Sequence, residues 1–261
     1  MKAKNLFPKT YNLTIGWLYP ELMSTYGDRG NIIVLQKRCE WRNINVRIEK
    51  ISPDTEYQIL DTCDLFFMGG AQDTQQEIVN HDLFGKKGSA LKKKIEQGTP
   101  GLFICGAYQF LGKYYKTADG KILEGLKIFP SYTENPGENV NRLIGNIIIE
   151  PNSSTYNLKP KTYIVGFENH GGRTYLEDKS MTFATVKKGS GNNGKDKTEG
   201  IMYKNSIGTY LHGPILPKNP EIADWLIEKA VEVKYGEKIE LEPLDDSLEQ
   251  KAKDVVVKRN S

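Results

Sequence analysis

Short apolar runs alternate with helix-like patterns through the first 130 residues of the chain. Four runs of strand length are bounded by turn residues: 13–18, 45–51, 65–68 and 101–105. Four segments have apolar positions at helical spacing: 31–41, 74–82, 89–96 and 107–115. In the first of these segments Ile32, Leu35 and Cys39 form one apolar face. This alternation predicts βαβ units in an α/β fold around a mostly parallel central sheet flanked by helices.

The pattern changes after about residue 121. Five shorter strand candidates, which we expect to extend or flank the sheet, lie at 143–150, 163–167, 183–186, 201–203 and 207–211. Residues 189–200 are polar and rich in glycine, which predicts an exposed hairpin or a mobile loop. A helix is predicted to begin at Pro220. After Tyr235 the chain shows no clear core partner, so we predict one domain over 1–234 and a charged helical appendage over 235–261.

Composition narrows the class of protein. The chain has 261 residues, 38% of them hydrophobic and 26% charged, which is typical of a folded protein. Its 36 Lys and Arg residues and 33 Asp and Glu residues are scattered, so nucleic-acid binding has no support. Three widely spaced cysteines without a CxxC pair argue against a disulfide framework or a metal site. No apolar run has the length of a signal peptide or a transmembrane segment, and we expect a cytoplasmic protein.

Cys105 is the most informative candidate for chemistry. The predicted strand 101–105 ends on this thiol, Gly106 and Ala107 follow, and a helix begins. The turn would place the sulfur at the carboxyl edge of a parallel sheet, where α/β folds bind ligands. A helix N-terminus stabilises a thiolate, and the geometry resembles a nucleophile elbow. The alternative is a small buried cysteine that closes a strand. Cys39 and Cys63 lack this turn and are predicted to be structural.

A nucleophilic thiol needs a base, and two histidines follow predicted strands. His212 ends the run 207–211 and precedes a Gly-Pro turn, whereas His170 follows the strand 163–167. We favour His212 because its strand is the more central of the two, but either residue would also fit an ordinary surface loop. Cysteine and histidine partners are usually distant in sequence and close in space.

Two further loops contain glycines near predicted strand ends. The pair Gly69 and Gly70 would let backbone N–H groups approach a ligand, as an oxyanion hole requires, or would simply form a tight turn. The segment 26–31, with the sequence YGDRGN, precedes a helix and is consistent with a turn and an N-cap. It lacks the spacing of a phosphate-binding loop, so nucleotide binding by this chain has no support.

Together these features resemble the class I glutamine amidotransferases. The ending YLHGP, without a glutamate two residues after the histidine, is similar to the cobyric-acid-synthase branch of that superfamily. Five segments resemble the glutaminase subunits of lipid II isoglutaminyl synthase, the GatD type: YPELMSTYGDRGNI, FFMGGAQD, FICGAYQ, GFENHGGR and YLHGP. They extend from Tyr19 to Pro214. The resemblance implies a flavodoxin-like fold of three layers.

The resemblance also implies a set of site residues, and none of them is expected to bind a metal. Cys105 would attack the side-chain amide of glutamine, and His212 would move the proton. The residues expected to bind the oxyanion or the substrate are Gly70, Gly106, Gln109 and Arg142. Arg142 would grip the glutamine carboxylate through its bidentate fork, although an arginine at a strand start is also a common surface residue.

The partner that the resemblance implies is a Mur-ligase-like subunit (MurT type). That subunit would use ATP and Mg²⁺ to activate the D-glutamate carboxyl group of the lipid II stem peptide, and this chain would need no cofactor. Other readings remain open from the residues alone. They are a stand-alone cysteine hydrolase or peptidase, a glutaminase that serves another ATP-dependent amidation, and a binding module with an inactive thiol.

One departure from the wider superfamily concerns the acid that orients the histidine. Gly213, Pro214 and Ile215 follow His212, so no carboxylate occupies the expected position. We expect either Glu168, Asp73 or another distant acid, or a residue of the partner subunit, to orient the imidazole. If the partner supplies the acid, the isolated chain would be a poor glutaminase.

Overall fold

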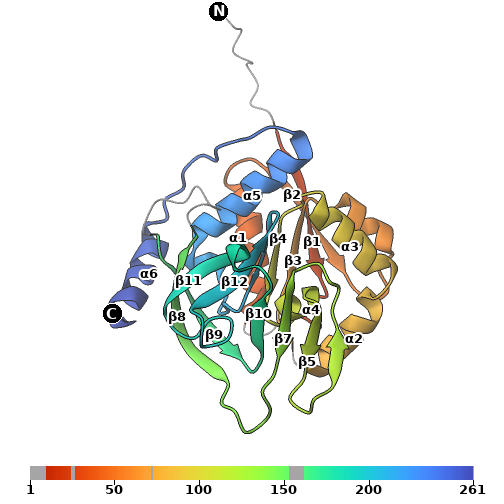
Figure 1. Ribbon diagram of the computed structural model, residues 1–261. Helices are drawn as coiled ribbons and strands as arrows, with labels where there is room; N and C mark the ends of the chain where they lie inside the picture. Colours follow the sequence, from red (N-terminus) through yellow and green to blue (C-terminus); the bar gives the residue numbers. More distant parts are fainter. Residues whose placement is uncertain (1–9, 25–26, 72, 153–161, 261) are drawn as a thin grey trace, which may run out of the picture.

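Apolar side chains alternate between the two faces of the central strands, and helices cover both faces (Figure 1). The computed structural model describes residues 10–24, 27–71, 73–152 and 162–260. On β3 (Leu65–Met68), Leu65 and Phe67 join one buried cluster, whereas Phe66 and Met68 join the other. Helices also contribute to both clusters: α1 (Arg29–Glu40) and α5 (Pro220–Tyr235) on one face, and α2 (Asp73–Leu83), α3 (Lys86–Glu96) and α4 (Gly106–Leu111) on the other. The predicted three-layer α/β fold is confirmed.

The large sheet has nine strands. Their spatial order is β2 (Asn45–Ile51), β1 (Asn12–Leu18), β3, β4 (Gly101–Ile104), β13 (Ser206–Thr209), β12 (Thr198–Tyr203), β11 (Thr182–Lys188), β8 (Leu143–Pro151) and β9 (Ile164–His170). The first five strands in this order run parallel, and the other four pair in antiparallel fashion. The later strands therefore extend the parallel sheet, as the sequence predicts.

A second sheet of four strands was not predicted. It consists of β10 (Arg173–Leu176), β7 (Ser131–Glu134), β5 (Tyr114–Lys116) and β6 (Ile122–Glu124). The predicted helix 107–115 is too long, because α4 ends at Leu111 and β5 follows almost at once. The carbonyl of Leu111 instead accepts N–H groups from Ile128 and Phe129, which bring the next segment against the helix end. Strands of three or four residues, rich in Tyr, Thr and charged side chains, give no apolar run to detect.

The glycine-rich segment 189–200 joins the antiparallel strands β11 and β12, so the predicted hairpin is correct. Its predicted exposure is wrong in the middle, where Gly191, Asn192 and Asn193 are buried. The Asn192 side chain bonds to the Gly200 backbone on both sides, accepting from its N–H and donating to its carbonyl. Such side-chain bonds to the backbone allow a polar hairpin to pack inside the protein.

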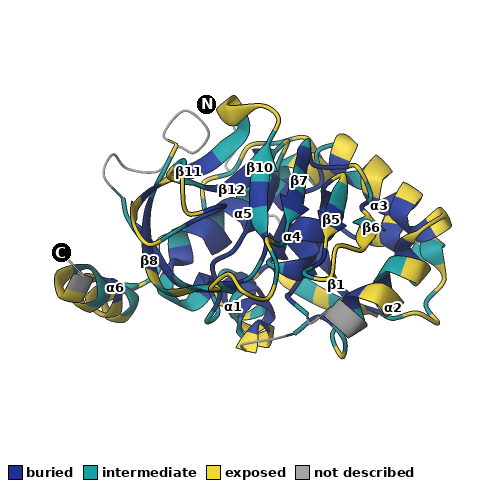
Figure 2. Cartoon of the chain, turned by 60° about the horizontal axis from the view of Figure 1, so that its bottom comes forward, coloured by how far each residue is buried: buried dark blue, intermediate teal, exposed yellow. Residues whose placement is uncertain are grey.

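The segment after Tyr235 packs against the rest of the protein at several points. Ile239 and Leu241 pack against the cluster that contains α1 and α5. The helix α6 (Ser247–Asn260) lies beside β8 and β9 (Figures 1 and 2), and Lys253 forms an ion pair with Glu221 of α5. The short helices η2 (Tyr57–Thr62), η3 (Lys179–Met181) and η4 (Leu216–Lys218) complete the described structure. Within the described residues, no helix is long and apolar enough to cross a membrane.

A buried arginine joins α1, α5 and the C-terminal segment. Arg38 is 3% exposed, and its guanidinium binds Asp224 at 2.6 and 2.7 Å. The same group binds Asp246 at 2.6 and 3.0 Å. Each carboxylate is satisfied by the bidentate geometry that arginine favours. The tail is therefore held by charge pairs as well as by apolar contacts.

We predict that Arg38→Ala lowers the free energy of unfolding by roughly 2–3 kcal/mol, because two partly buried carboxylates lose their shared cation. Urea denaturation of the full chain measures this loss. Lys37→Ala is the control, since Lys37 is about half exposed and pairs with the exposed Glu40. That variant should stay within about 0.5 kcal/mol of the unaltered chain. Equal losses for the two variants would contradict the structural role of Arg38.

Candidate active site

Cys105 lies on a sharp turn between β4 and α4, as the sequence predicts. Its backbone has φ of 52° and ψ of −105°, a conformation that is strained for a residue with a side chain. The Cys105 N–H donates to the Thr209 carbonyl of β13 at 2.8 Å, and the Cys105 carbonyl accepts from the Gln109 N–H at 2.9 Å. The neighbouring strand and the following helix therefore hold the turn in place. Cys105 is partly exposed, whereas Cys39 and Cys63 are buried.

His212 follows the strand next to Cys105. β13 pairs in parallel with β4, so the chain segments that leave their carboxyl ends start side by side. The His212 backbone is fixed by an isolated bridge to Phe167, with an N–H to carbonyl distance of 2.8 Å. Burial lowers the pKa of His212, but the Cys105 thiolate and the Asp28 carboxylate raise it more, to about 10. The imidazole is therefore protonated at neutral pH and can give its proton to a leaving group.

Asp28 is a residue of the site that the sequence analysis missed. Its Oδ1 atom lies 3.5 Å from Nδ1 of His212, and both side chains are fully buried. The segment containing Asp28 was interpreted as a turn with an N-cap, yet its side chain makes no capping bond to α1. Its position in the chain was the one signal that could have identified Asp28 as a site residue. Asp28 lies in the connection that leaves the carboxyl end of β1, the edge at which Cys105 and His212 also lie.

The two glycines predicted to bind an oxyanion lie near each other, but they differ in what their backbones contact. A Cβ atom built on Gly106 would lie 3.2 Å from the backbone nitrogen of Ala71 and 2.8 Å from Nε2 of Gln76, so a side chain here would disturb the approach. The Gly70 N–H already donates to Oδ2 of Asp28 at 2.8 Å. This bond argues against Gly70 as an oxyanion donor. The backbone N–H groups of Ala71 and Gly106 are the better candidates.

Gln109 is buried on α4, one turn after Cys105. Its Nε2 donates to the Tyr210 hydroxyl at 3.1 Å. That hydroxyl also bonds to Thr174 at 2.6 Å, and Thr174 bonds to Thr133 at 2.6 Å. Thr133 and Thr174 belong to β7 and β10, so the unpredicted small sheet supports this side of the site. The role of Gln109 in holding glutamine stays a prediction.

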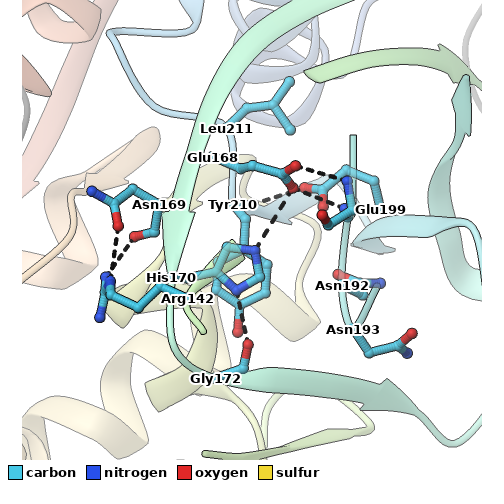
Figure 3. Close-up of polar contacts among 12 residues, drawn as sticks. Arg142, Glu168, Asn169, His170, Gly172, Asn192, Asn193, Glu199, Tyr210 and Leu211 are labelled. Carbon is cyan, nitrogen blue, oxygen red and sulfur yellow. Dashed lines mark hydrogen bonds and ion pairs between the residues drawn. The ribbon is translucent and has the colours of Figure 1, made fainter. Parts of the chain in front are cut away.

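Arg142 lies at the surface immediately before β8, as expected from the sequence. Its Nε atom donates to Oδ1 of Asn169 at 2.9 Å, and one Nη atom donates to the Asn169 carbonyl at 2.8 Å (Figure 3). A Cβ atom built on Gly171 would lie 3.4 Å from the other Nη atom. The guanidinium is therefore fixed at the end of β9. Its contact with a substrate carboxylate stays a prediction.

His170, the alternative base, is a packed core histidine. Its ring stacks on Tyr210 with centroids 3.6 Å apart, and Nδ1 lies 2.8 Å from the Gly172 carbonyl (Figure 3). Burial lowers the pKa of His170, against the opposing effect of Glu168. No described contact joins this ring to Cys105. The structure therefore favours His212 as the base.

Glu168, the first acid named as a candidate to orient His212, is bonded to other groups. Its carboxylate accepts the N–H groups of Ser190 and Gly191 at 2.7 and 2.8 Å (Figure 3). It also lies 3.9 Å from Nε2 of His170. Glu168 is thus occupied by the buried hairpin and the other histidine. The side chain of Asp73, the second named candidate, lies outside the described residues.

The sequence was compared with models of known protein families, and the result agrees with the geometry of the site. The model of the CobB/CobQ-like glutamine amidotransferase domain matches residues 14–220. The chain belongs to this glutamine amidotransferase family. It is therefore an enzyme of the amidotransferase class, and the elements that carry Cys105, His212 and Asp28 all lie within the matched region.

Two curated relatives match nearly the whole amidotransferase chain. The lipid II isoglutaminyl synthase (glutamine-hydrolyzing) subunit GatD of Staphylococcus aureus is 49% identical over 249 residues, covering 95% of this chain and 96% of the relative. The corresponding subunit of Streptococcus pneumoniae is 40% identical, covering 92% and 88%. Among solved structures, a chain of PurLQS from Thermotoga maritima has a TM-score of 0.51 at 15% identity, covering 87% of this chain and 99% of its own. That likeness concerns the fold alone.

We predict that a thiol reagent such as iodoacetamide labels Cys105 at pH 7.5 and spares the other two cysteines. Burial raises the pKa of both Cys39 and Cys63 to about 12, so their thiols stay protonated and shielded. Peptide mapping by mass spectrometry measures the labelled sites. Cys105→Ser is the control and should abolish labelling of the folded chain. Label on Cys39 or Cys63 with Cys105 intact would contradict the assignment.

Proposed function

We propose that this amidotransferase is the glutamine-hydrolysing subunit of a lipid II isoglutaminyl synthase. It would release ammonia for a partner that converts the D-glutamate of the lipid II stem peptide to D-isoglutamine. The names of the two GatD relatives, which specify lipid II, support this acceptor. The observation that carries the chemistry is the placement of Cys105 and His212 at the ends of the paired strands β4 and β13.

In the first half of the reaction, the Cys105 thiolate attacks the amide carbon of glutamine. The carbonyl oxygen becomes an oxyanion, and we expect the N–H groups of Ala71 and Gly106, which lie near each other, to stabilise it. His212 then gives its proton to the leaving nitrogen as the C–N bond breaks. Ammonia and a thioester between Cys105 and the glutamyl group result.

In the second half, His212 is neutral and acts as a general base. It takes a proton from water, the resulting hydroxide adds to the thioester carbon, and the C–S bond breaks to release glutamate. The thiolate and the imidazolium are then restored. The raised pKa of His212 suits this return, because the proton goes back to the ring between two negative groups.

The partner we infer is a Mur-ligase-like subunit of the MurT type. Such a subunit would hold ATP and Mg²⁺ and activate the acceptor carboxyl group. The word "subunit" in the names of both relatives supports an assembly of this kind. In this division of work, the chain described here needs only glutamine and water.

We predict that Cys105→Ala abolishes glutamine-dependent amidation by the assembled enzyme, whereas high concentrations of an ammonium salt restore the product. The reason is that the thiol generates ammonia but does not activate the acceptor. Product formation from lipid II, measured by mass spectrometry, tests both routes. Cys39→Ala is the control and should retain both.

Two results would contradict this function. If ammonium failed to rescue an assembled Cys105→Ala complex, the thiol would have another duty. If the unaltered chain cleaved peptides or esters but not glutamine, a stand-alone cysteine hydrolase would be the better assignment.

For Arg142→Ala we expect the KM for glutamine to rise about ten- to hundredfold, with kcat within about threefold. Loss of a charge-assisted bond to the substrate carboxylate is worth roughly 1.5–3 kcal/mol and acts on binding. Steady-state glutaminase assays separate the two constants. Arg47→Ala is the control, since Arg47 is an exposed residue of the edge strand β2. A KM within twofold of the unaltered enzyme would remove Arg142 from the site.

A further inference from the structure

Asp28 is placed as an N-cap residue but does not serve as one. It precedes α1, where an aspartate normally accepts an N–H group of the first helical turn. No such bond is present, and the side chain is completely buried. Its two oxygens have other partners, with Oδ2 on the Gly70 N–H at 2.8 Å and Oδ1 3.5 Å from Nδ1 of His212. The carboxylate thus connects the base with the loop that follows β3.

The charges around His212 make Asp28 the acid that faces the ring. A buried carboxylate is destabilising unless it is paired, and among described residues His212 is its ion-pair partner. From the β4–α4 turn the ring faces Cys105, and from η4 the ammonium of Lys218 binds the Gly213 carbonyl. On β9, Glu168 and His170 face each other. Asp28 therefore supplies the negative charge that lies next to Nδ1 of the imidazole.

The start of α1 also holds the chain that follows His212. A Cβ atom built on Gly30 would lie 2.5 Å from Cγ of Pro214, so the proline ring rests directly on the helix backbone. Oδ1 of Asn31 accepts the Leu216 N–H at 2.9 Å, and both residues are fully buried. One helix start therefore positions the acid and the segment 213–216. This double attachment fixes the distance between the carboxylate and the ring.

The loop after β3 is shaped around the same carboxylate. A Cβ atom built on Gly69 would lie 2.8 Å from Oδ2 of Asp28 and 2.5 Å from the Met23 carbonyl. Only glycine tolerates this approach without displacement of its neighbours. The Gly70 N–H then completes the contact, and Ala71 is the next backbone donor along the loop. The pair of glycines thus adapts the loop to Asp28.

We propose that Asp28 is the positioning residue that orients His212 through Nδ1, in place of an acid two residues after the histidine, and that it holds the 69–71 loop with its second oxygen. The inference rests on the proposed glutaminase function of this site. It also means that the chain contains its own orienting acid and does not require one from a partner subunit.

The test compares Asp28→Asn with Asp64→Asn in the full chain. Asparagine keeps the size of Asp28 and an acceptor for the Gly70 N–H, but it removes the negative charge. Asp64 is a matched control, because it also accepts a backbone N–H, that of Thr14 at 2.8 Å, but it lies outside the site. Circular dichroism and urea denaturation verify that both variants fold.

For Asp28→Asn we expect kcat for glutamine hydrolysis to fall at least tenfold, with KM within threefold. Replacement of the orienting aspartate in a serine protease lowers kcat roughly 10⁴-fold, which we take as the upper limit for the decrease expected here. The alkaline limb of the kcat/KM profile should also move to lower pH. The carboxylate raises the pKa of His212, so its removal lets the imidazolium lose its proton earlier as the pH rises. Asp64→Asn should change neither quantity.

One readout does not depend on glutamine hydrolysis. The NMR titration of the His212 ring should shift to lower pH in Asp28→Asn, because the carboxylate raises the pKa of the ring. If the unaltered chain failed to hydrolyse glutamine but Asp28→Asn showed this shift, the proposed function would be wrong and the positioning role would stand. A folded Asp28→Asn variant with unchanged kcat and an unchanged His212 titration would overturn the role of Asp28.

Two further results also decide whether Asp28 orients His212. Restoration of full kcat to Asp28→Asn by the partner subunit would show that the acid comes from the partner. If Asp28→Asn did not fold, the titration of His212 in the unaltered chain would decide. The proposal requires the ring to keep its proton well above neutral pH, near the pKa of about 10. Loss of the proton below about pH 7, close to the ordinary histidine pKa, would overturn it.

Discussion

The parallel pairing of β4 with β13 is the constraint on which the site depends. It brings together two segments that are far apart in sequence, and the Cys105 N–H to Thr209 carbonyl bond extends the pairing into the nucleophile turn. A buried carboxylate, Glu199, fixes the end of β13 by accepting from the Thr209 hydroxyl at 2.7 Å and the Tyr210 N–H at 2.8 Å. A slip of one residue would turn every side chain of β13 to the other face. The distance from Cys105 to His212 is therefore set by sheet register.

The sequence predicts those parts of the site that local patterns encode. A strand that ends in Cys105 before Gly106, and a strand that leads to His212, are visible because each signal fits within ten residues. Asp28 gives no such local signal, since its partner His212 is far away in the sequence and an aspartate before a helix is typical of an N-cap. The small sheet was missed for a similar reason, because β5, β6, β7 and β10 are too short and polar for periodicity to reveal. Long-range pairing, rather than local propensity, decides both cases.

The residues with proposed roles in chemistry and in substrate binding rest on different parts of the fold. Cys105 and His212 follow strands of the large sheet, and their contacts run through its backbone. Gln109 is supported through Tyr210 by the threonines of the small sheet. Arg142 is held at the edge formed by β8 and β9. A change on the small sheet or on this edge can therefore alter the binding of glutamine while the thiolate and imidazolium keep their geometry.

The buried charged groups of the site must stabilise one another for the fold around them to be stable. An isolated carboxylate or imidazolium inside a protein is strongly unfavourable, but Asp28 and His212 lie together, so each offsets the cost of burying the other. The Gly70 N–H stabilises the carboxylate of Asp28 through its second oxygen. The imidazole therefore has a fixed carboxylate on one side and the partly exposed Cys105 on the other, which is the arrangement that proton transfer to a group bound at Cys105 requires.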